Sequence, residues 1–165
     1  MNQLLIMAGF IVLVVLLVMM APFIKNLLQG EQGDEKLPFR FKKYFFTKSE
    51  QEFFRILEQQ IDHSRFTIFP KVRLGDFVET TAKGEKRQAS WNRIKSRHVD
   101  FLIYDTQKSL IAVAIELDGN SHNSERAQKS DDFKNRLYSS IGLELVRVKV
   151  GTDFATEISQ ILEKL

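Results

Sequence analysis

The sequence predicts an α/β domain, with a mixed β-sheet flanked by helices, that follows one N-terminal transmembrane helix. Two observations predict this class. Residues 4–24 form an uncharged apolar run, and after it segments with helical spacing alternate with β-prone runs, the order of α/β layers. We therefore divide the 165-residue chain into an anchor (1–28), a linker (29–46) and one soluble domain (47–165).

The apolar run from Leu4 to Ile24 has the length of about twenty residues that a bilayer core requires. No basic segment precedes it and no small-x-small cleavage site follows it, so a removed signal peptide is disfavoured. The positive-inside rule then predicts an outside N-terminus and a cytoplasmic domain, so we expect a single-pass membrane anchor. The charges that give this orientation are Lys25, Lys36, Arg40, Lys42 and Lys43.

The first element of the domain is predicted to be a helix that begins at Thr47. Thr47 and Glu50 have the spacing of a capping box, and Ser49 with Glu52 offers a second one. Apolar residues then recur at helical spacing, which predicts a buried stripe. The stripe contains Phe53, Ile56, Leu57 and Ile61.

Three β-prone runs follow the first helix. Residues 67–74 contain Pro70, which restricts this strand to a sheet edge or to its own beginning. Residues 80–90 are polar and are predicted to form a loop. Residues 99–104 and 110–117 are separated by a short polar segment, which predicts a hairpin.

The last third of the domain is predicted to be helix, strand and helix. Residues 124–141 form a charged amphipathic pattern that ends at Gly142, a typical C-cap. Residues 143–150 read as a strand, and Thr152 or Asp153 caps a final helix. A hairpin followed by a helix and one more strand predicts a mixed sheet.

Acidic residues interrupt the predicted hairpin where apolar residues are expected. Asp100 lies near the start of one strand, and Glu116 and Asp118 end the next, two residues apart and so on one face. Carboxylates there are costly to bury unless they hold a cation or bind substrate, and His122 follows closely. The three acids therefore predict a Mg²⁺ or Mn²⁺ site.

A structural alternative stays open for these acids: one is a turn residue, and another pairs with Arg126 or Lys134. The charge distribution fits either interpretation. Residues 36–97 carry fifteen Lys and Arg against seven Asp and Glu, whereas residues 99–165 carry eight against eleven. Such an uneven distribution of charge is typical of a domain that binds a metal and a polyanion, and it is equally typical of ordinary surface charge. The absence of cysteine excludes disulfides and thiolate zinc sites.

Five motifs in order resemble the PD-(D/E)xK restriction-endonuclease-like superfamily. The resemblance is closest to the group that contains very-short-patch-repair-type endonucleases and a related bacterial family of unknown function. It covers about residues 47–165. The motifs are Thr47–Glu50, Val99–Phe101, Ile115–His122, Asp131–Lys134 and Gly142–Arg147.

The resemblance implies a restriction-endonuclease-like fold and hydrolysis of nucleic-acid phosphodiester bonds, most plainly those of DNA, with Mg²⁺ or Mn²⁺. Asp100 and Glu116 match the superfamily's metal-binding acids, and Glu50 matches the glutamate that often completes the site, besides its capping role. Asp118 stands where the superfamily usually has a lysine that positions the attacking water. His122 as a base, Lys134 as a displaced lysine, or Asp118 as a further ligand would compensate, and we favour His122 with Asp118.

Basic residues near the predicted site are candidates for phosphate contact. Arg126, Lys134 and Arg147 lie beyond the hairpin, and Arg147 equally fits an ion pair with the acids. A second group precedes the Asp100 strand, where basic residues and an aromatic suit a nucleic-acid groove or a plain solvated loop. This group is Trp91, Arg93, Lys95 and Arg97.

From the sequence we therefore expect a membrane-tethered, metal-dependent nuclease. The alternative is a catalytically inactive nuclease-fold module that binds nucleic acid or a protein partner at the membrane, and the missing lysine favours it. A third possibility is a structural membrane protein with no role at nucleic acid. The fold is better supported than the activity, because activity resides in the site rather than in the fold.

Overall fold

The computed structural model describes residues 2–28, 37–119 and 125–165. For residues 2, 4–5, 26–28 and 125–127 it describes the backbone alone. The chain separates into two units, residues 1–42 and 43–165, each of which is described by itself. Most of the predicted linker, residues 29–36, lies outside the described residues.

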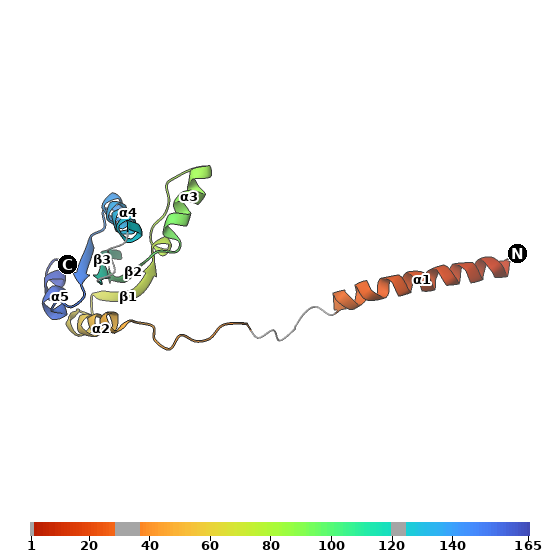
Figure 1. Ribbon diagram of the computed structural model, residues 1–165, viewed down its shortest axis with the longest axis horizontal. Helices are drawn as coiled ribbons and strands as arrows, with labels where there is room; N and C mark the ends of the chain where they lie inside the picture. Colours follow the sequence, from red (N-terminus) through yellow and green to blue (C-terminus); the bar gives the residue numbers. More distant parts are fainter. Residues whose placement is uncertain (1, 29–36, 120–124) are drawn as a thin grey trace. The chain divides into compact units, whose positions relative to one another are not determined.

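The first unit contains helix α1, Asn2–Leu28 (Figure 1). Its segment Ile6–Lys25 has a mean hydropathy of 2.8, and the side chains of that segment are exposed in the structure. Helix α1 is therefore long and apolar enough to cross a membrane, as the composition of residues 4–24 predicts.

The second unit is built on a mixed four-stranded sheet in the order β1-β2-β3-β4. Strand β1 (Phe66–Arg73) pairs antiparallel with β2 (His98–Asp105), and β2 pairs antiparallel with β3 (Leu110–Asp118). Strand β4 (Leu145–Lys149) lies parallel to β3. The predicted hairpin and mixed sheet are confirmed, and Pro70 lies in an edge strand, where its missing N–H is tolerated.

One face of the sheet is covered by α2 (Lys48–Gln60) and α5 (Phe154–Leu162). The predicted capping box begins α2: the Glu50 carboxylate accepts from the Thr47 N–H at 2.8 Å. Ser49 lies inside α2, so the second possible box does not form. These helices and the sheet share an apolar core that includes Phe53, Leu57, Phe101, Ile115, Phe154 and Ile158.

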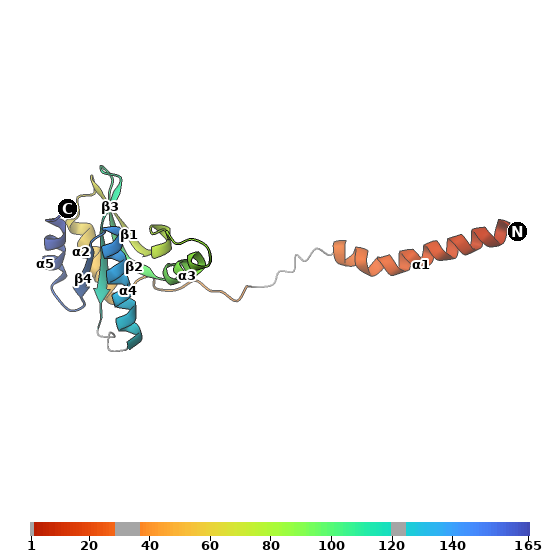
Figure 2. The same cartoon turned by 90° about the horizontal axis from the view of Figure 1, so that it is seen from above.

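The opposite face of the sheet packs against α4 (Glu125–Ile141), and Figures 1 and 2 show α4 and α2 on opposite sides of the strands. The φ of +69° at Gly142 fits its predicted place after the helix. Asp153, rather than Thr152, caps α5 by accepting the Ala155 N–H. Buried residues of the α4 layer include Leu74, Val99, Leu102, Ala114 and Tyr138.

The loop predicted over residues 80–90 is wrong in its second half, because helix α3 (Glu85–Ile94) forms there. A short 3₁₀ turn, η1 (Leu74–Asp76), precedes it. Helix α3 buries only Ile94, so its sequence lacks the apolar periodicity that marks a helix. Gly84, with a φ of +56°, gives the chain its turn into α3.

Candidate acidic site

The pairing of β2 and β3 brings two of the predicted acids together. Phe101 pairs with Ile115, and the same register continued by one residue sets Asp100 beside Glu116. The Asp100 carboxylate accepts the Leu117 N–H at 2.9 Å, which ties it to β3. Directly opposed residues of an antiparallel pair share a face, so both carboxylates lie on the α4 side of the sheet.

Glu116 is 5% exposed and lies between two cations. Lys134 of α4 donates from Nζ to Oε1 of Glu116 and also to the His98 carbonyl at 3.2 Å. Arg147 of β4 approaches Oε2 at 3.4 Å. Burial nevertheless raises the pKa of Glu116, because the cost of desolvating its charge outweighs the stabilisation by both cations. The negative charge of nearby Asp100 also raises this pKa.

Arg147 also forms ion pairs with two further acids, Asp118 and Asp131. The parallel register pairs Arg147 with Glu116, and its Nη1 lies 3.0 Å from Oδ1 of Asp118 and 3.5 Å from Oδ1 of Asp131. Glu116 and Asp118 thus point the same way, as their spacing predicts. Of the two roles left open for Arg147 by the sequence, the structure shows the ion pair.

Asp100 differs from its neighbours, because it takes part in no ion pair with any described residue. Within the described ranges, no group of three or more His, Asp and Glu side chains is placed to hold a metal ion. The three-ligand set of Asp100, Glu116 and Asp118 therefore stays a prediction. Mg²⁺ is commonly bound by one or two carboxylates with water and substrate phosphate, and Asp100 and Glu116 match that number of carboxylates.

Tyr138 is a member of this site that the sequence reasoning missed. It is 1% exposed, and its hydroxyl has no hydrogen-bond partner among the described residues. Burial raises the pKa of Tyr138, and the charge of Glu116 adds to this effect. Its spacing of four residues from Lys134 is the signal that places both on one face of α4. A buried orphan hydroxyl marks a place for an ordered water or ligand.

Glu50 lies at the start of α2 and binds Lys71 at 2.7 Å. Burial alone raises the pKa of Glu50, but hydrogen bonds from Lys71 and Thr47 hold it below its usual value. Lys71 has a φ of +51°, which is unusual for a residue other than glycine. The residues on either side of it, Pro70 and Val72, pair with Phe101 and Val99 of β2. The register therefore places Lys71 opposite Asp100, a neighbour that no sequence pattern indicated.

The basic group before β2 forms part of the α3–α4 contact. The guanidinium groups of Arg93 and Arg97 lie 4.4 Å and 4.8 Å from the ring centroid of Phe133, the residue before Lys134. Lys95 is exposed. His122 and the side chain of Arg126 lie outside the described residues, so their predicted roles stay predictions.

A model of one protein family, described as "Protein of unknown function (DUF2726)", matches residues 42–165. The chain belongs to the DUF2726 family. The match covers the sheet, its flanking helices and all residues of the acidic site, so the site lies wholly within the DUF2726 domain. No curated protein and no solved structure matches the chain.

Proposed function

We propose that this protein is a membrane-anchored, divalent-metal-dependent nuclease with a restriction-endonuclease-like domain. The observation that carries the proposal is the pairing of Asp100, which has no cation partner among the described residues, with buried Glu116 on the neighbouring strand. Two adjacent carboxylates, one of them without a cation, favour capture of a divalent ion. The ordered motifs shared with the PD-(D/E)xK superfamily give the same two residues that role.

Asp100 and Glu116 would hold Mg²⁺ or Mn²⁺, since carboxylate oxygens are the ligands that these hard cations prefer. The orphan hydroxyl of Tyr138 supports the fit, because it lies near Glu116 and Asp100 and lacks a partner that a bound water would supply. When bound, such an ion acidifies a water and neutralises charge that develops on the phosphate.

Lys134 is our candidate for the role of the missing superfamily lysine. Its ammonium is anchored by Glu116 and by the His98 carbonyl, so it is fixed beside the acidic pair although it comes from α4. A fixed cation there orients the attacking water and stabilises negative charge in the transition state. Asp118, which occupies the usual lysine position in the sequence, is instead held by Arg147.

Helix α1 would hold the nuclease domain at the inner membrane, with the N-terminus outside and the domain in the cytoplasm. Its length and composition suit a bilayer span, and the basic residues that follow it favour this orientation. The substrate is nucleic acid, with DNA expected, since the superfamily's chemistry acts on phosphodiester bonds.

A second candidate function is a catalytically inactive module that binds nucleic acid or a protein partner at the membrane. One observation favours it: both oxygens of Glu116 already face cations, Lys134 on one side and Arg147 on the other. Such pairing satisfies a buried carboxylate without any metal.

Cleavage of labelled DNA by the full chain in detergent micelles tests the proposal. We expect strand cleavage with Mn²⁺ or Mg²⁺ and none with EDTA. Lys134→Met should lower kcat by about 10²- to 10³-fold, the usual effect of removing one group that stabilises transition-state charge. Lys164→Met, which removes an exposed lysine near the C-terminus, is the matched control and should cleave as the wild type does.

Cleavage that continues in EDTA would overturn the proposed metal dependence. DNA binding that weakens with salt but never leads to cleavage would instead support the inactive module. Thermal unfolding of Lys134→Met, measured beside the wild type, separates a loss of chemistry from a loss of fold.

A further inference from the structure

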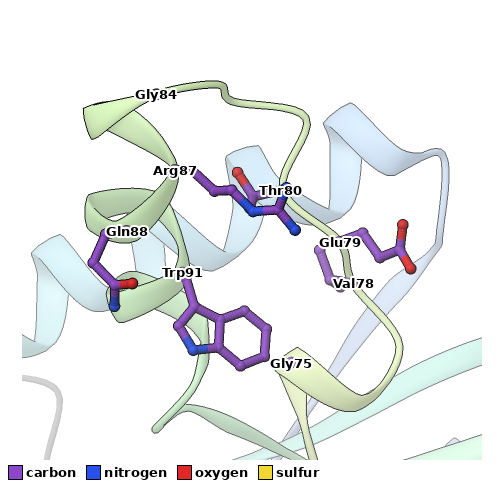
Figure 3. Close-up of a pocket in the computed structure, with 8 residues that line it drawn as sticks. All are labelled: Gly75, Val78, Glu79, Thr80, Gly84, Arg87, Gln88 and Trp91. Atoms are coloured by element: carbon purple, nitrogen blue, oxygen red, sulfur yellow. The ribbon is translucent and has the colours of Figure 1, made fainter.

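A hollow of about 630 Å³ lies between η1, the loop that follows it, and α3 (Figure 3). Its volume is in the range of small-molecule and ligand sites. We call it the Trp91 pocket after its central residue. Its lining residues are Gly75, Val78, Glu79, Thr80, Gly84, Arg87, Gln88 and Trp91.

Trp91 is the single tryptophan of the chain, and 39% of it is exposed. The edge of its indole ring rests on Gly75, where an added Cβ would lie 2.9 Å from Cη2 of Trp91. A side chain at position 75 would therefore displace the ring, and glycine lets the indole pack against the backbone there. The pocket thus contains a large aromatic surface that is partly open to solvent, which is the property of a stacking platform.

Arg87 supplies a free cation beside this platform. Its side chain extends from α3 toward Thr80, on the same side of the pocket as Trp91 (Figure 3). The Arg87 guanidinium forms no ion pair or hydrogen bond with any described residue, whereas Glu79 turns its carboxylate away from the ring (Figure 3). An unpaired guanidinium is well suited to bind a phosphate.

The α3 side of the pocket is strongly positive. Residues 83–97 contain six Lys and Arg and one acid, Glu85. The basic residues are Lys83, Lys86, Arg87, Arg93, Lys95 and Arg97. An aromatic platform beside this basic segment fits a ligand that is planar at one end and anionic at the other, which is the chemistry of a nucleotide.

We infer that the Trp91 pocket binds an unpaired nucleobase of a nucleic-acid strand, with the base stacked on Trp91 and its phosphate on Arg87. A base inside a duplex already stacks on its neighbours, so this pocket selects single-stranded or frayed substrate over closed duplex. This inference deepens the proposed nuclease function and, in naming its substrate class, rests on it.

The chain connects this pocket directly to the acidic site. Helix α3 ends at Ile94, and β2, which carries Asp100, begins at His98. Arg93, in the last turn of α3, and Arg97, between α3 and β2, both lie over Phe133, which is adjacent in sequence to Lys134. A strand held at Trp91 thus meets a row of cations that leads toward the proposed catalytic residues.

Fluorescence of the single tryptophan tests the inference, because Trp91 is both the platform and the reporter. The full chain in micelles with EDTA is titrated with a single-stranded oligonucleotide, a relaxed closed-circular duplex without free ends, and a mononucleotide. We expect the single strand to quench the emission, with an affinity that falls as salt rises and exceeds that for the closed duplex at least about tenfold. Equal quenching by the closed duplex would overturn the selection of unpaired bases. Equal affinity for the mononucleotide would show a free-nucleotide site instead.

Two variants keep the reporter and alter the pocket. Arg87→Ala and Gly75→Ala should each weaken single-strand quenching by about tenfold, the first by removing the phosphate contact and the second by displacing the indole. Arg136→Ala, on the exposed surface of α4, is the matched control and should bind as the wild type does. Unchanged quenching in Arg87→Ala would refute the pocket even if Gly75→Ala misfolds. EDTA prevents cleavage, so the titration measures binding alone. If the single strand quenches the emission in EDTA but the chain does not cleave DNA in Mn²⁺, the nuclease proposal is rejected and the binding pocket is retained.

Discussion

Asp100→Asn is expected to lower the rate of metal-dependent DNA cleavage by about a thousandfold or more. The change removes one of the two carboxylates that would hold the ion, and a bound ion contributes several kcal/mol of transition-state stabilisation. Asparagine retains an oxygen that can accept the Leu117 N–H, so the link between β2 and β3 should survive. The measurement is the initial rate of cleavage at saturating Mn²⁺.

Asp132→Asn is the control for this change. Asp132 is an exposed acid on α4, and its replacement removes the same charge without touching Glu116. We expect wild-type rates from it. Cleavage by Asp100→Asn at a rate near that of the wild type would show that the acidic site does not perform the reaction.

Glu116→Ala is expected to lower the free energy of unfolding by about 3 kcal/mol. Loss of one partner from a buried ion pair typically costs about 3–5 kcal/mol, because the other charge stays buried without compensation. We expect the lower end, since the side chains of Lys134 and Arg147 are 16% and 22% exposed and so keep some water. Denaturant unfolding at neutral pH measures the difference.

Glu116→Gln provides the comparison, because glutamine resembles the neutral acid in size and shape. The pKa of Glu116 is raised in the folded state above its ordinary value of 4.5. The carboxyl's contribution to stability is thus fully present below about pH 4.5 and is lost as the pH rises through the folded-state pKa. The difference in unfolding free energy between wild type and Glu116→Gln should therefore shift in favour of the variant as the pH rises. A shift in the opposite direction would contradict a desolvated Glu116.

The elements that the sequence predicts correctly are those set by local chemistry. The capping box of Thr47 and Glu50, the turn at Gly142 and the hairpin of β2 and β3 each depend on residues close together in the chain. Helix α3 was missed for the opposite reason. It is held by Ile94 and by the contact of Trp91 with Gly75, and tertiary contacts of this kind leave no periodic pattern in the sequence.

The contacts of the acidic site also differ in whether they depend on residues close together or far apart in the chain. The hairpin pattern places Asp100 and Glu116 on neighbouring strands. A register shift between Ile103 and Tyr104 decides which residues of the two strands face each other, and no sequence pattern predicted that shift. The position of Arg147 depends on the parallel pairing of β3 with β4, which a whole helix separates, so the sequence left its role open. Lys134 is the clearest case: the sequence favoured His122 over it, and only the packing of α4 on the sheet reveals the contact of Lys134 with Glu116.

Binding of Mn²⁺ to the full chain in micelles, followed by electron paramagnetic resonance, tests the central claim most directly. We expect the wild type to bind Mn²⁺, Asp132→Asn to bind it with similar affinity, and Asp100→Asn to bind it at least about tenfold more weakly. Equal Mn²⁺ affinity in wild type and Asp100→Asn, or no binding by the wild type, would contradict a metal site at Asp100 and Glu116.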